Sequence, residues 1–263
     1  MQNATTGGAS IYDYPKYYDL VYGSDWKAEV DFLEYCIDAF VPHKVKRLFE
    51  PACGTGRLMF RMSKQGYRVQ GLDLNEKAVD FCNQRLERHG FADRAFVGDM
   101  CDFELKKKFD VGFNTINSFR HLLSEAEAAS HLQCMADNMN VGGIYVLGLH
   151  LLPLGQHECE GEYWTAQRGM LAINTRMWQI ELDIKKRIET FRLEFDVYTP
   201  TDIQKIGDDV AFRTYTKPQI LSLVRRSPFE IAGVYDFAYD FENPAELNDK
   251  TEDVVLILQK SAN

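Results

Sequence analysis

The chain has 263 residues, enough for one large α/β domain, and its 45% of apolar and 26% of charged residues are typical of an ordinary folded domain. Thirty basic residues against 39 acidic ones give a formal charge of −9, so we expect neither nucleic acid nor a membrane as a partner. Six cysteines are scattered without a CxxC pair, which argues against a disulfide framework and against a metal site.

The first ten residues, MQNATTGGAS, are polar and uncharged, so we expect a disordered tail over 1–10 ahead of a single domain over 11–263. This start lacks the basic and apolar regions of a signal peptide, and together with the unpaired cysteines it predicts a cytoplasmic protein. The next segment, IYDYPKYYDLVYG, places five tyrosines around one proline. Helical spacing of apolar residues from Trp26 onward then predicts a helix that ends before Pro42.

Strand and helix patterns alternate from residue 45 to residue 150. Short apolar runs predict strands at 45–50, 67–73, 94–99, 108–115 and 142–150. Helices are expected between them, over 56–65, from an Asn75 cap to a Gly90 stop, and from a capping box formed by Ser124 and Glu127. This rhythm predicts an α/β fold with a parallel sheet that carries helices on both faces.

The pattern changes after His150, because residues 161–216 contain strand-like segments with no helix between them. Over 190–198, apolar residues alternate with charged ones, which predicts a strand with one buried and one solvated face. Near Met177 the apolar residues change from odd-numbered to even-numbered positions, which predicts a β-bulge there. We therefore expect an antiparallel β lid over 161–216, followed by a helix that Thr216 and Gln219 cap and that runs to Arg226, and by strands at 229–239 and 253–260.

The segment LFEPACGTGRL, residues 48–58, is the strongest chemical signal. An apolar strand ends in Glu50, small residues follow at positions 52, 54 and 56, and a helix then begins. Small residues let a ligand approach the backbone, and a helix N-terminus favours an anionic group. A tight strand-to-helix turn without a ligand is the alternative, and dinucleotide binding is another, although Met59 stands where its third glycine would be.

Two further acids close the next strands. Asp73 ends the second strand, where a carboxylate can accept from ribose hydroxyls, and Asp99 ends the third strand. Beside Asp99, Met100 could pack on an adenine ring while the carboxylate accepts from the adenine amino group. Either acid alone could be a solvated strand end, but three acids at consecutive strand ends favour a nucleoside-binding site.

With these motifs, the sequence resembles class I S-adenosylmethionine-dependent methyltransferases from about Tyr14 to the C-terminus, most specifically over residues 48–122. The resemblance implies a Rossmann-like, mostly parallel sheet of seven strands with an antiparallel last strand. It also implies S-adenosyl-L-methionine as cofactor, with S-adenosyl-L-homocysteine as product. It implies that the cofactor contacts the glycine-rich loop, the ends of strands two to four and the N-terminal aromatic residues: Tyr14, Tyr22, Trp26, Glu50, Ala52, Cys53, Gly54, Gly56, Arg57, Asp73, Leu74, Asp99, Met100 and Asn114.

The pattern is most similar to small-molecule N-methyltransferases of the glycine and amino-sugar type, through the segments YYDLVYG, INSFRHL and FRTYT. We expect a small-molecule methyl acceptor, an amine nitrogen as the reacting atom, and His121, Asn117 and His150 as catalytic candidates, although a histidine in such a place can also serve packing. Arg120, Arg176 and Arg213 could pair with a carboxylate or phosphate. Two alternatives remain open: an O-methyltransferase for a carboxylate or hydroxyl, and a non-catalytic cofactor-binding sensor or partner domain.

Overall fold

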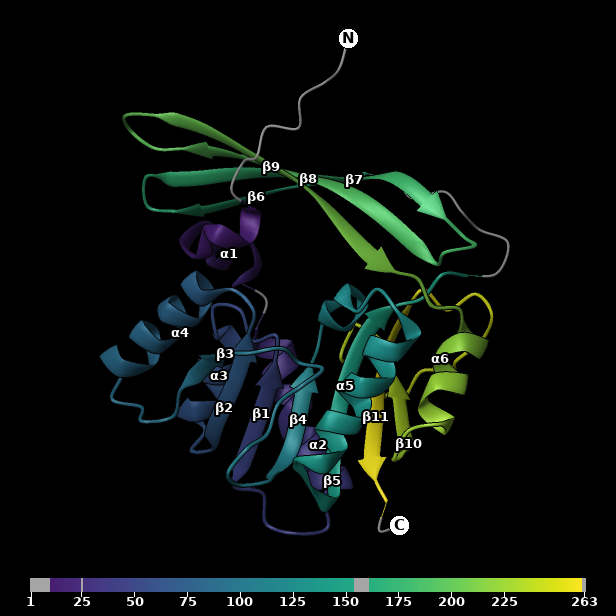
Figure 1. Cartoon of the computed structure of the whole chain (residues 1–263). Helices are drawn as coiled ribbons and strands as arrows, with labels where there is room; N and C mark the ends of the chain where they lie inside the picture. The colour runs from purple at the N-terminus through teal and green to yellow at the C-terminus, as the bar shows by residue number, and fades with distance from the viewer. Residues whose placement is uncertain (1–9, 25, 154–160, 262–263) are drawn as a thin grey trace.

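A central sheet of seven strands runs in the order β10-β11-β5-β4-β1-β2-β3 (Figure 1). Our computed structural model describes residues 10–24, 26–153 and 161–261, so the predicted tail lies outside the described residues except for Ser10. The strands are β1 (Arg47–Pro51), β2 (Arg68–Asp73), β3 (Ala95–Val97), β4 (Phe109–Asn114), β5 (Met139–His150), β10 (Phe229–Tyr235) and β11 (Asp253–Lys260). All neighbours from β3 to β5 are parallel, and β11 is antiparallel to β5 and β10, as expected.

Helices cover both faces of this sheet, which confirms the expected architecture. The helices α2 (Lys27–Phe40), α3 (Arg57–Lys64) and α4 (Glu76–Arg88) pack on one face, and α5 (Glu125–Asp137) and α6 (Lys217–Arg225) on the other. Strand β5 shows the reason, because Ile144 and Val146 belong to the first core while Tyr145 and Leu147 belong to the second. All four side chains are fully buried, as a two-sided parallel sheet requires.

The predicted caps form. Asn75 accepts from the amide of Ala78 at 3.0 Å, and reciprocal side-chain bonds close the Ser124 and Thr216 capping boxes. The strand ends differ from expectation: β3 stops at Val97, so Asp99 lies in a following turn, and β10 stops at Tyr235. In the lid, the bulge falls between Gln179 and Glu181 rather than at Met177, because Ile180 is the residue left without a partner.

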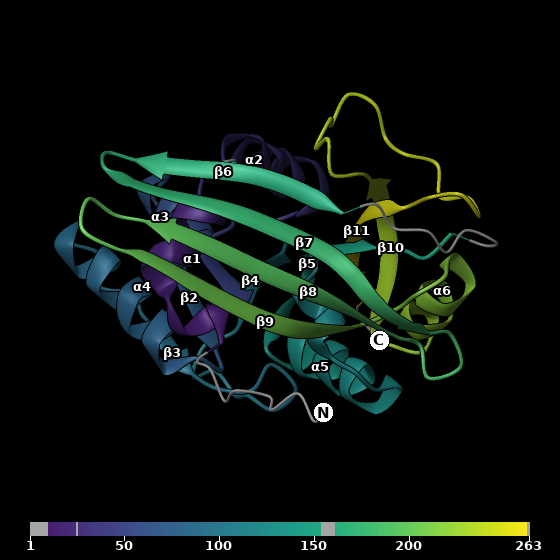
Figure 2. The ribbon, with the colours of Figure 1, turned by 90° about the horizontal axis from the view of Figure 1, so that it is seen from above.

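A second, antiparallel sheet lies across the carboxyl end of the central sheet (Figures 1 and 2). It consists of β6 (Glu162–Arg168), β7 (Leu171–Asp183), β8 (Ile188–Tyr198) and β9 (Ile203–Arg213). The alternation read from the sequence is confirmed in β8, where Phe191, Leu193, Phe195 and Val197 are buried. On its other face, Arg192 pairs with Asp209 at 2.9 Å. This sheet is the lid.

The N-terminal segment fills one end of the space between the lid and the central sheet (Figure 1). It forms a short 3-10 helix η1 (Ile11–Asp13) and helix α1 (Pro15–Tyr22). Ile11, Leu20 and Val21 join the apolar face of the lid in one core cluster, and Ser10 donates to Asp208 of β9. No helix among the described residues has both the length and the apolar character to cross a bilayer.

Candidate functional site

The glycine-rich loop between β1 and α3 takes left-handed backbone angles at Ala52 (φ 51°), Gly54 (φ 51°) and Gly56 (φ 67°). For Ala52 this conformation costs roughly 1–2 kcal/mol, so the rest of the loop holds it there. A Cβ added at Gly54 would meet nothing within 4 Å, whereas one at Gly56 would lie 2.2 Å from the Cys82 sulfur. Gly54 therefore faces open space, and Gly56 is needed for packing on α4.

Asp73 at the end of β2 receives two backbone amides. Its Oδ2 accepts from Gly54 and its Oδ1 from Asn75, both at 2.8 Å. Burial raises the pKa of Asp73 while these two hydrogen bonds lower it. Each oxygen retains a lone pair for a further donor, and the adjacent Leu74 side chain is 73% exposed. The Asp73 carboxylate can accept from the hydroxyls of a ribose, and the exposed Leu74 side chain can pack against the base that the ribose carries.

Asp99 and Met100 lie in the turn after β3. The Asp99 side chain is exposed, and its Oδ1 accepts from the Cys101 amide at 2.8 Å. Met100 is only 7% exposed and packs in the core with Phe49 and Leu72. The carboxylate is therefore available to a ligand, but the Met100 side chain points into the core and not, as the sequence suggested, onto an open ring site.

Arg57 and Glu50 lie beneath the loop. Arg57 makes a bidentate ion pair with Glu29 of α2, at 2.6 and 2.9 Å, and Glu29 also accepts from the Thr115 hydroxyl. Arg57 therefore supports the loop from α2. The buried Glu50 accepts from the Met59 amide at 3.2 Å, and burial raises its pKa well above the usual range, with Arg57 acting in the opposite direction. The sequence analysis did not identify Glu29 as the partner of Arg57. The one sign of this role in the sequence is that Glu29 is an acidic residue on the apolar face of the predicted helix.

Two more predicted residues lie at the same edge. Cys53 is buried, and its amide donates to Leu72 at 2.8 Å. The Asn114 amide nitrogen donates to the Pro51 carbonyl at 3.2 Å, while its buried Oδ1 has no hydrogen-bond partner. A buried acceptor without a donor is costly, and the ammonium group of S-adenosylmethionine would satisfy it. This acceptor, the open side of Gly54 and the Asp73 carboxylate fit that cofactor.

The three predicted N-terminal aromatic residues lie in different places. Trp26 packs under the guanidinium of Arg61 in α3, 3.9 Å from the ring centre. Tyr14 stacks on Tyr17, and its hydroxyl accepts from Gln204 of the lid at 3.5 Å. Tyr22 lies between Tyr18 and Trp164 of the lid, with ring centroids 4.6 and 5.9 Å apart. The structure therefore assigns Trp26 to helix packing and Tyr14 to contact with the lid.

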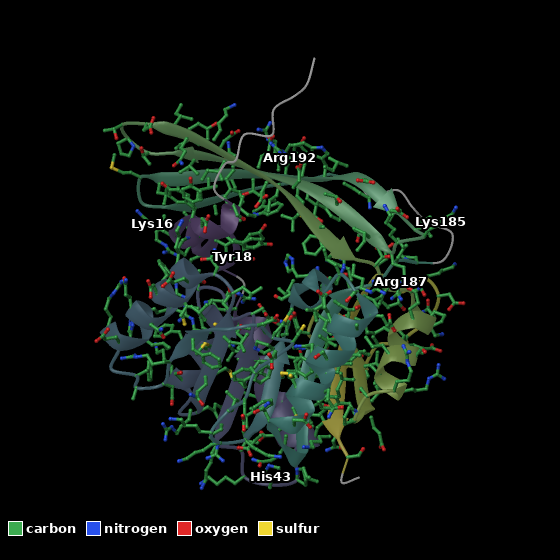
Figure 3. All side chains as sticks on the ribbon, in the orientation of Figure 1. Lys16, Tyr18, His43, Lys185, Arg187 and Arg192 are labelled. Carbon is green, nitrogen blue, oxygen red and sulfur yellow. The ribbon has the colours of Figure 1, made fainter. Side chains whose placement is uncertain are left out.

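A chain of aromatic rings runs from the lid through the N-terminal segment and back to the lid, with neighbouring ring centroids 4.6–5.9 Å apart. We call it the aromatic belt; it consists of Trp164, Tyr22, Tyr18, Tyr12, His121 and Phe212. In Figure 3 Tyr18 lies between the two sheets, while Arg192 lies on the outer side of the lid. Tyr12, Trp164 and Phe212 were missed because nothing local in the sequence links them.

His121 ends the 3-10 helix η2 (Ser118–His121), and its Nε2 lies 3.3 Å from the Tyr12 hydroxyl. Burial, together with the charge of Arg120, lowers the pKa of His121 to about 4. His121 is nevertheless exposed to water, and the other five residues of the belt are half-buried. His121 therefore contacts the belt while remaining accessible to a ligand. Burial also raises the pKa of Tyr12 well above its usual value, so both partners are neutral at pH 7.

The other two catalytic candidates have structural contacts. The Asn117 Oδ1 accepts from the His150 amide at 2.8 Å, and the Asn117 amide donates to Gly148 at 3.0 Å. His150 Nδ1 bonds to Asp253 of β11. Asn117, in the left-handed conformation (φ 56°), thus joins η2 to β5. These bonds make Asn117 and His150 structural links between η2, β5 and β11, and of the three candidates only His121 takes part in the aromatic belt.

The three arginines considered as anion ligands are all held by carboxylates of the chain. Arg120 pairs with Glu189 of β8 inside the protein. Arg176 pairs with Glu194 at 2.8 Å on the outer face of the lid. Arg213 pairs with Glu125 at 3.1 Å and, with Arg187, anchors the foot of the lid to α5. Figure 3 shows Arg187 at this junction.

Comparison with known proteins agrees with this geometry. Residues 49–143 match the family model described as "Methyltransferase domain". A dTDP-3-amino-3,4,6-trideoxy-alpha-D-glucopyranose N,N-dimethyltransferase of Streptomyces venezuelae is 28% identical over 138 residues, 51% of this chain and 56% of that protein. The chain thus spans a little over half the length of the curated relatives it matches.

Two solved structures have the same fold over nearly the whole chain. The sugar N-methyltransferase KedS8 from Streptoalloteichus has a TM-score of 0.76 at 16% identity, covering 99% of this chain and 98% of that one. CalS10, an amino pentose methyltransferase from Micromonospora echinaspora solved with S-adenosylmethionine bound, has a TM-score of 0.72 at 16% identity, covering 99% and 100%. Residues 49–143 therefore match a methyltransferase domain, and the chain as a whole has the fold of S-adenosylmethionine-dependent methyltransferases.

Proposed function

We propose that the protein transfers a methyl group from S-adenosylmethionine to the amine nitrogen of a small molecule held between the lid and the carboxyl edge of the central sheet. The observation that carries the proposal is the neutral His121, which is paired with Tyr12 and lies in the aromatic belt between the lid and the N-terminal segment. The relatives named as amino-sugar N,N-dimethyltransferases support an amine on a sugar-like acceptor.

The chain's residues provide a place for the cofactor at the same edge. Gly54 would lie against its methionine part, Asn114 would accept from its ammonium group, Asp73 would bind the ribose, and Asp99 the adenine amino group. When bound, S-adenosylmethionine supplies a methyl group that its sulfonium already activates. The protein's contribution is then to bind both substrates, to align them and to exclude water.

Proton transfer falls to His121. An amine acceptor is a nucleophile only when neutral, and it must lose a proton in the course of methylation. A histidine with a pKa of about 4 is unprotonated at pH 7. With the ring proton on Nε2, which then donates to the Tyr12 hydroxyl 3.3 Å away and fixes the ring, the lone pair of Nδ1 can accept the proton of the amine. A low pKa makes His121 a weak base. It therefore orients the amine lone pair as much as it removes the proton.

Alignment under the lid has the larger effect. Holding two reactants in position can lower a barrier by about 7–11 kcal/mol, against about 3–5 kcal/mol for a placed acid or base. The belt supplies flat apolar walls for this purpose, and its hydroxyls remain uncharged because burial raises the pKa of Tyr18 to about 12. A ring-bearing acceptor packed on these faces would present its amine to His121.

The test is a matched pair of acceptors: the 3-amino sugar nucleotide that the Streptomyces venezuelae relative's name describes, and its 3-hydroxy counterpart. We expect S-adenosylhomocysteine to form with the amine only. Turnover of the hydroxyl compound would instead indicate an O-methyltransferase. Binding of cofactor with no turnover of any amine or hydroxyl acceptor would indicate the sensor function.

Variants of two histidines test the role of His121. We expect His121→Gln to lower turnover by about 10²-fold or more without changing the affinity for S-adenosylhomocysteine. The control His89→Gln, whose histidine bonds to the Arg85 carbonyl at the end of α4, should leave both unchanged. Since the pKa of His121 lies near 4, the base is available throughout pH 6–9, so the rise of rate with pH should follow the ionisation of the acceptor amine in both proteins. An unchanged rate in His121→Gln would contradict the assignment.

A further inference from the structure

Helix α5 holds the turn that follows β3 through side chains on one face. Ser130 Oγ and Cys134 Sγ both donate to the Cys101 carbonyl, at 2.9 and 3.1 Å. Asn138 donates to the Phe103 carbonyl at 3.1 Å and accepts from the Leu105 amide at 2.7 Å. Three residues spaced by four lie on the same side of a helix, so this face of α5 fixes the backbone of 101–105.

His131 of α5 extends this contact to Met100. The side chain is completely buried, its Nδ1 lies 2.9 Å from the Met100 carbonyl, and its Nε2 lies 2.9 Å from the Tyr145 hydroxyl of β5. A carbonyl only accepts hydrogen bonds. The neutral ring with its proton on Nδ1 therefore satisfies both bonds, donating to Met100 and accepting from Tyr145. Burial lowers the pKa of His131 to about 4, in agreement with this neutral form.

The same turn carries Asp99. The Cys101 amide donates to the Asp99 carboxylate at 2.8 Å, and the Asp102 amide donates to the Asp99 carbonyl at 3.1 Å. The exposed carboxylate is therefore oriented by the backbone that His131 and Ser130 hold in place. Because the side chain of Met100 lies in the core, the turn is fixed from below by packing and from the side by α5.

We infer that His131, supported by Tyr145, is a positioning residue that holds the turn after β3 so that Asp99 recognises the adenine amino group of the cofactor. The inference rests on the proposed function, because it takes the adenine end of S-adenosylmethionine to lie at Asp99. His131 touches no ligand in this account. It acts through the Met100 carbonyl, and its loss lets the turn shift while the ribose site at Asp73 and the loop at Gly54 keep their own contacts.

The test measures a preference between two ligands by calorimetry: S-adenosylhomocysteine, and S-inosylhomocysteine, in which an oxygen replaces the adenine amino group. A hydrogen bond to a charged acceptor predicts that the wild-type protein binds the first about ten- to a hundredfold more tightly. We expect His131→Leu to bring this ratio close to one, and Tyr145→Phe, which removes only the hydroxyl, to reduce it in part. General destabilisation would weaken both ligands equally and leave the ratio unchanged.

His89 offers a matched control, because its Nδ1 also lies 2.8 Å from a backbone carbonyl, that of Arg85 within α4. His89→Leu should keep the wild-type ratio. A folded His131→Leu protein with the wild-type ratio would overturn the inference, and if that variant does not fold, an unchanged ratio in Tyr145→Phe would do so. If the wild-type protein does not bind S-adenosylhomocysteine, the proposed function is overturned as well. If the wild type methylates an amine but the variants keep its ratio of affinities for the two ligands, only the inference about His131 is overturned.

Discussion

Replacing Gly54 with alanine should separate backbone strain from cofactor binding. Gly54 has φ 51°, and a Cβ added there would point into space that no protein atom occupies within 4 Å. Gly66, in the turn after α3, has φ 96°, and its added Cβ would likewise meet nothing within 4 Å. The two glycines thus share a left-handed backbone and an open side, but only Gly54 adjoins Asp73 through its amide.

The expected sizes follow from this comparison. An alanine in the left-handed region costs roughly 1–2 kcal/mol, so both Gly54→Ala and Gly66→Ala should lower the free energy of unfolding by about that amount. At Gly54 the methyl group would also occupy space that we assign to the cofactor. Forcing a methyl group into a filled site costs about 1–3 kcal/mol, which corresponds to about a five- to 150-fold loss of affinity.

Urea unfolding and calorimetric titration with S-adenosylhomocysteine measure the two effects on the same preparations. We expect similar unfolding midpoints for the two variants and weak binding by Gly54→Ala alone. If Gly54→Ala binds S-adenosylhomocysteine as tightly as Gly66→Ala does, the open side of Gly54 does not face the cofactor.

Three further outcomes are expected. Asp73→Asn should weaken binding of S-adenosylhomocysteine by about ten- to a hundredfold, and calorimetry showing wild-type affinity would remove Asp73 from the site. Because asparagine has one acceptor oxygen for the two backbone amides that Asp73 binds, the variant should also lose about 1–3 kcal/mol of stability. Asp19→Asn should lower the free energy of urea unfolding by about 3 kcal/mol, because the buried Asp19 pairs with Arg85 at 2.5 Å. The control Asp31→Asn, at an exposed position, should change this free energy by less than about 1 kcal/mol. Equal losses in the two variants would show that burial of the ion pair does not decide its contribution. In the folded protein the pKa of His131 is about 4, against an ordinary value of 6.5, so between these two pH values the unfolded chain binds a proton that the folded protein does not. The free energy of unfolding should therefore fall by about 3 kcal/mol through this group as the pH drops from 6.5 to 4. If His131→Leu loses as much stability over this range as the wild type, His131 is not the cause of the loss.

The central sheet could be predicted from the sequence because its signals are local. Each strand is a short apolar run, the helices α4, α5 and α6 carry caps that the sequence shows, and the acids Glu50 and Asp73 lie at the ends of their strands. Parallel strands bring their carboxyl ends to one edge, so the cofactor edge followed without knowledge of any long-range contact. The lid strands followed for the same reason, from their alternation of apolar and charged residues.

The acceptor side could not be predicted, because it depends on residues far apart in the sequence. Tyr12 meets His121 across 109 positions, and Arg57 meets Glu29 across 28. Tyr14 and Trp26 share the aromatic character of Tyr12 and Tyr18, but the direction in which η1 and α1 enter turns them toward the lid and α3 instead. Only tertiary packing decides which ring of such a segment faces the site.

The most direct test of the account is the electron density of S-adenosylhomocysteine and the amino sugar nucleotide in a crystal of the ternary complex. We predict the ribose on Asp73, the adenine beside Asp99 and the amine within hydrogen-bond distance of His121, under the lid. A ligand found instead in the surface groove between α5 and α6, where Glu125 and Arg226 lie, or an amine that faces away from His121, would contradict it.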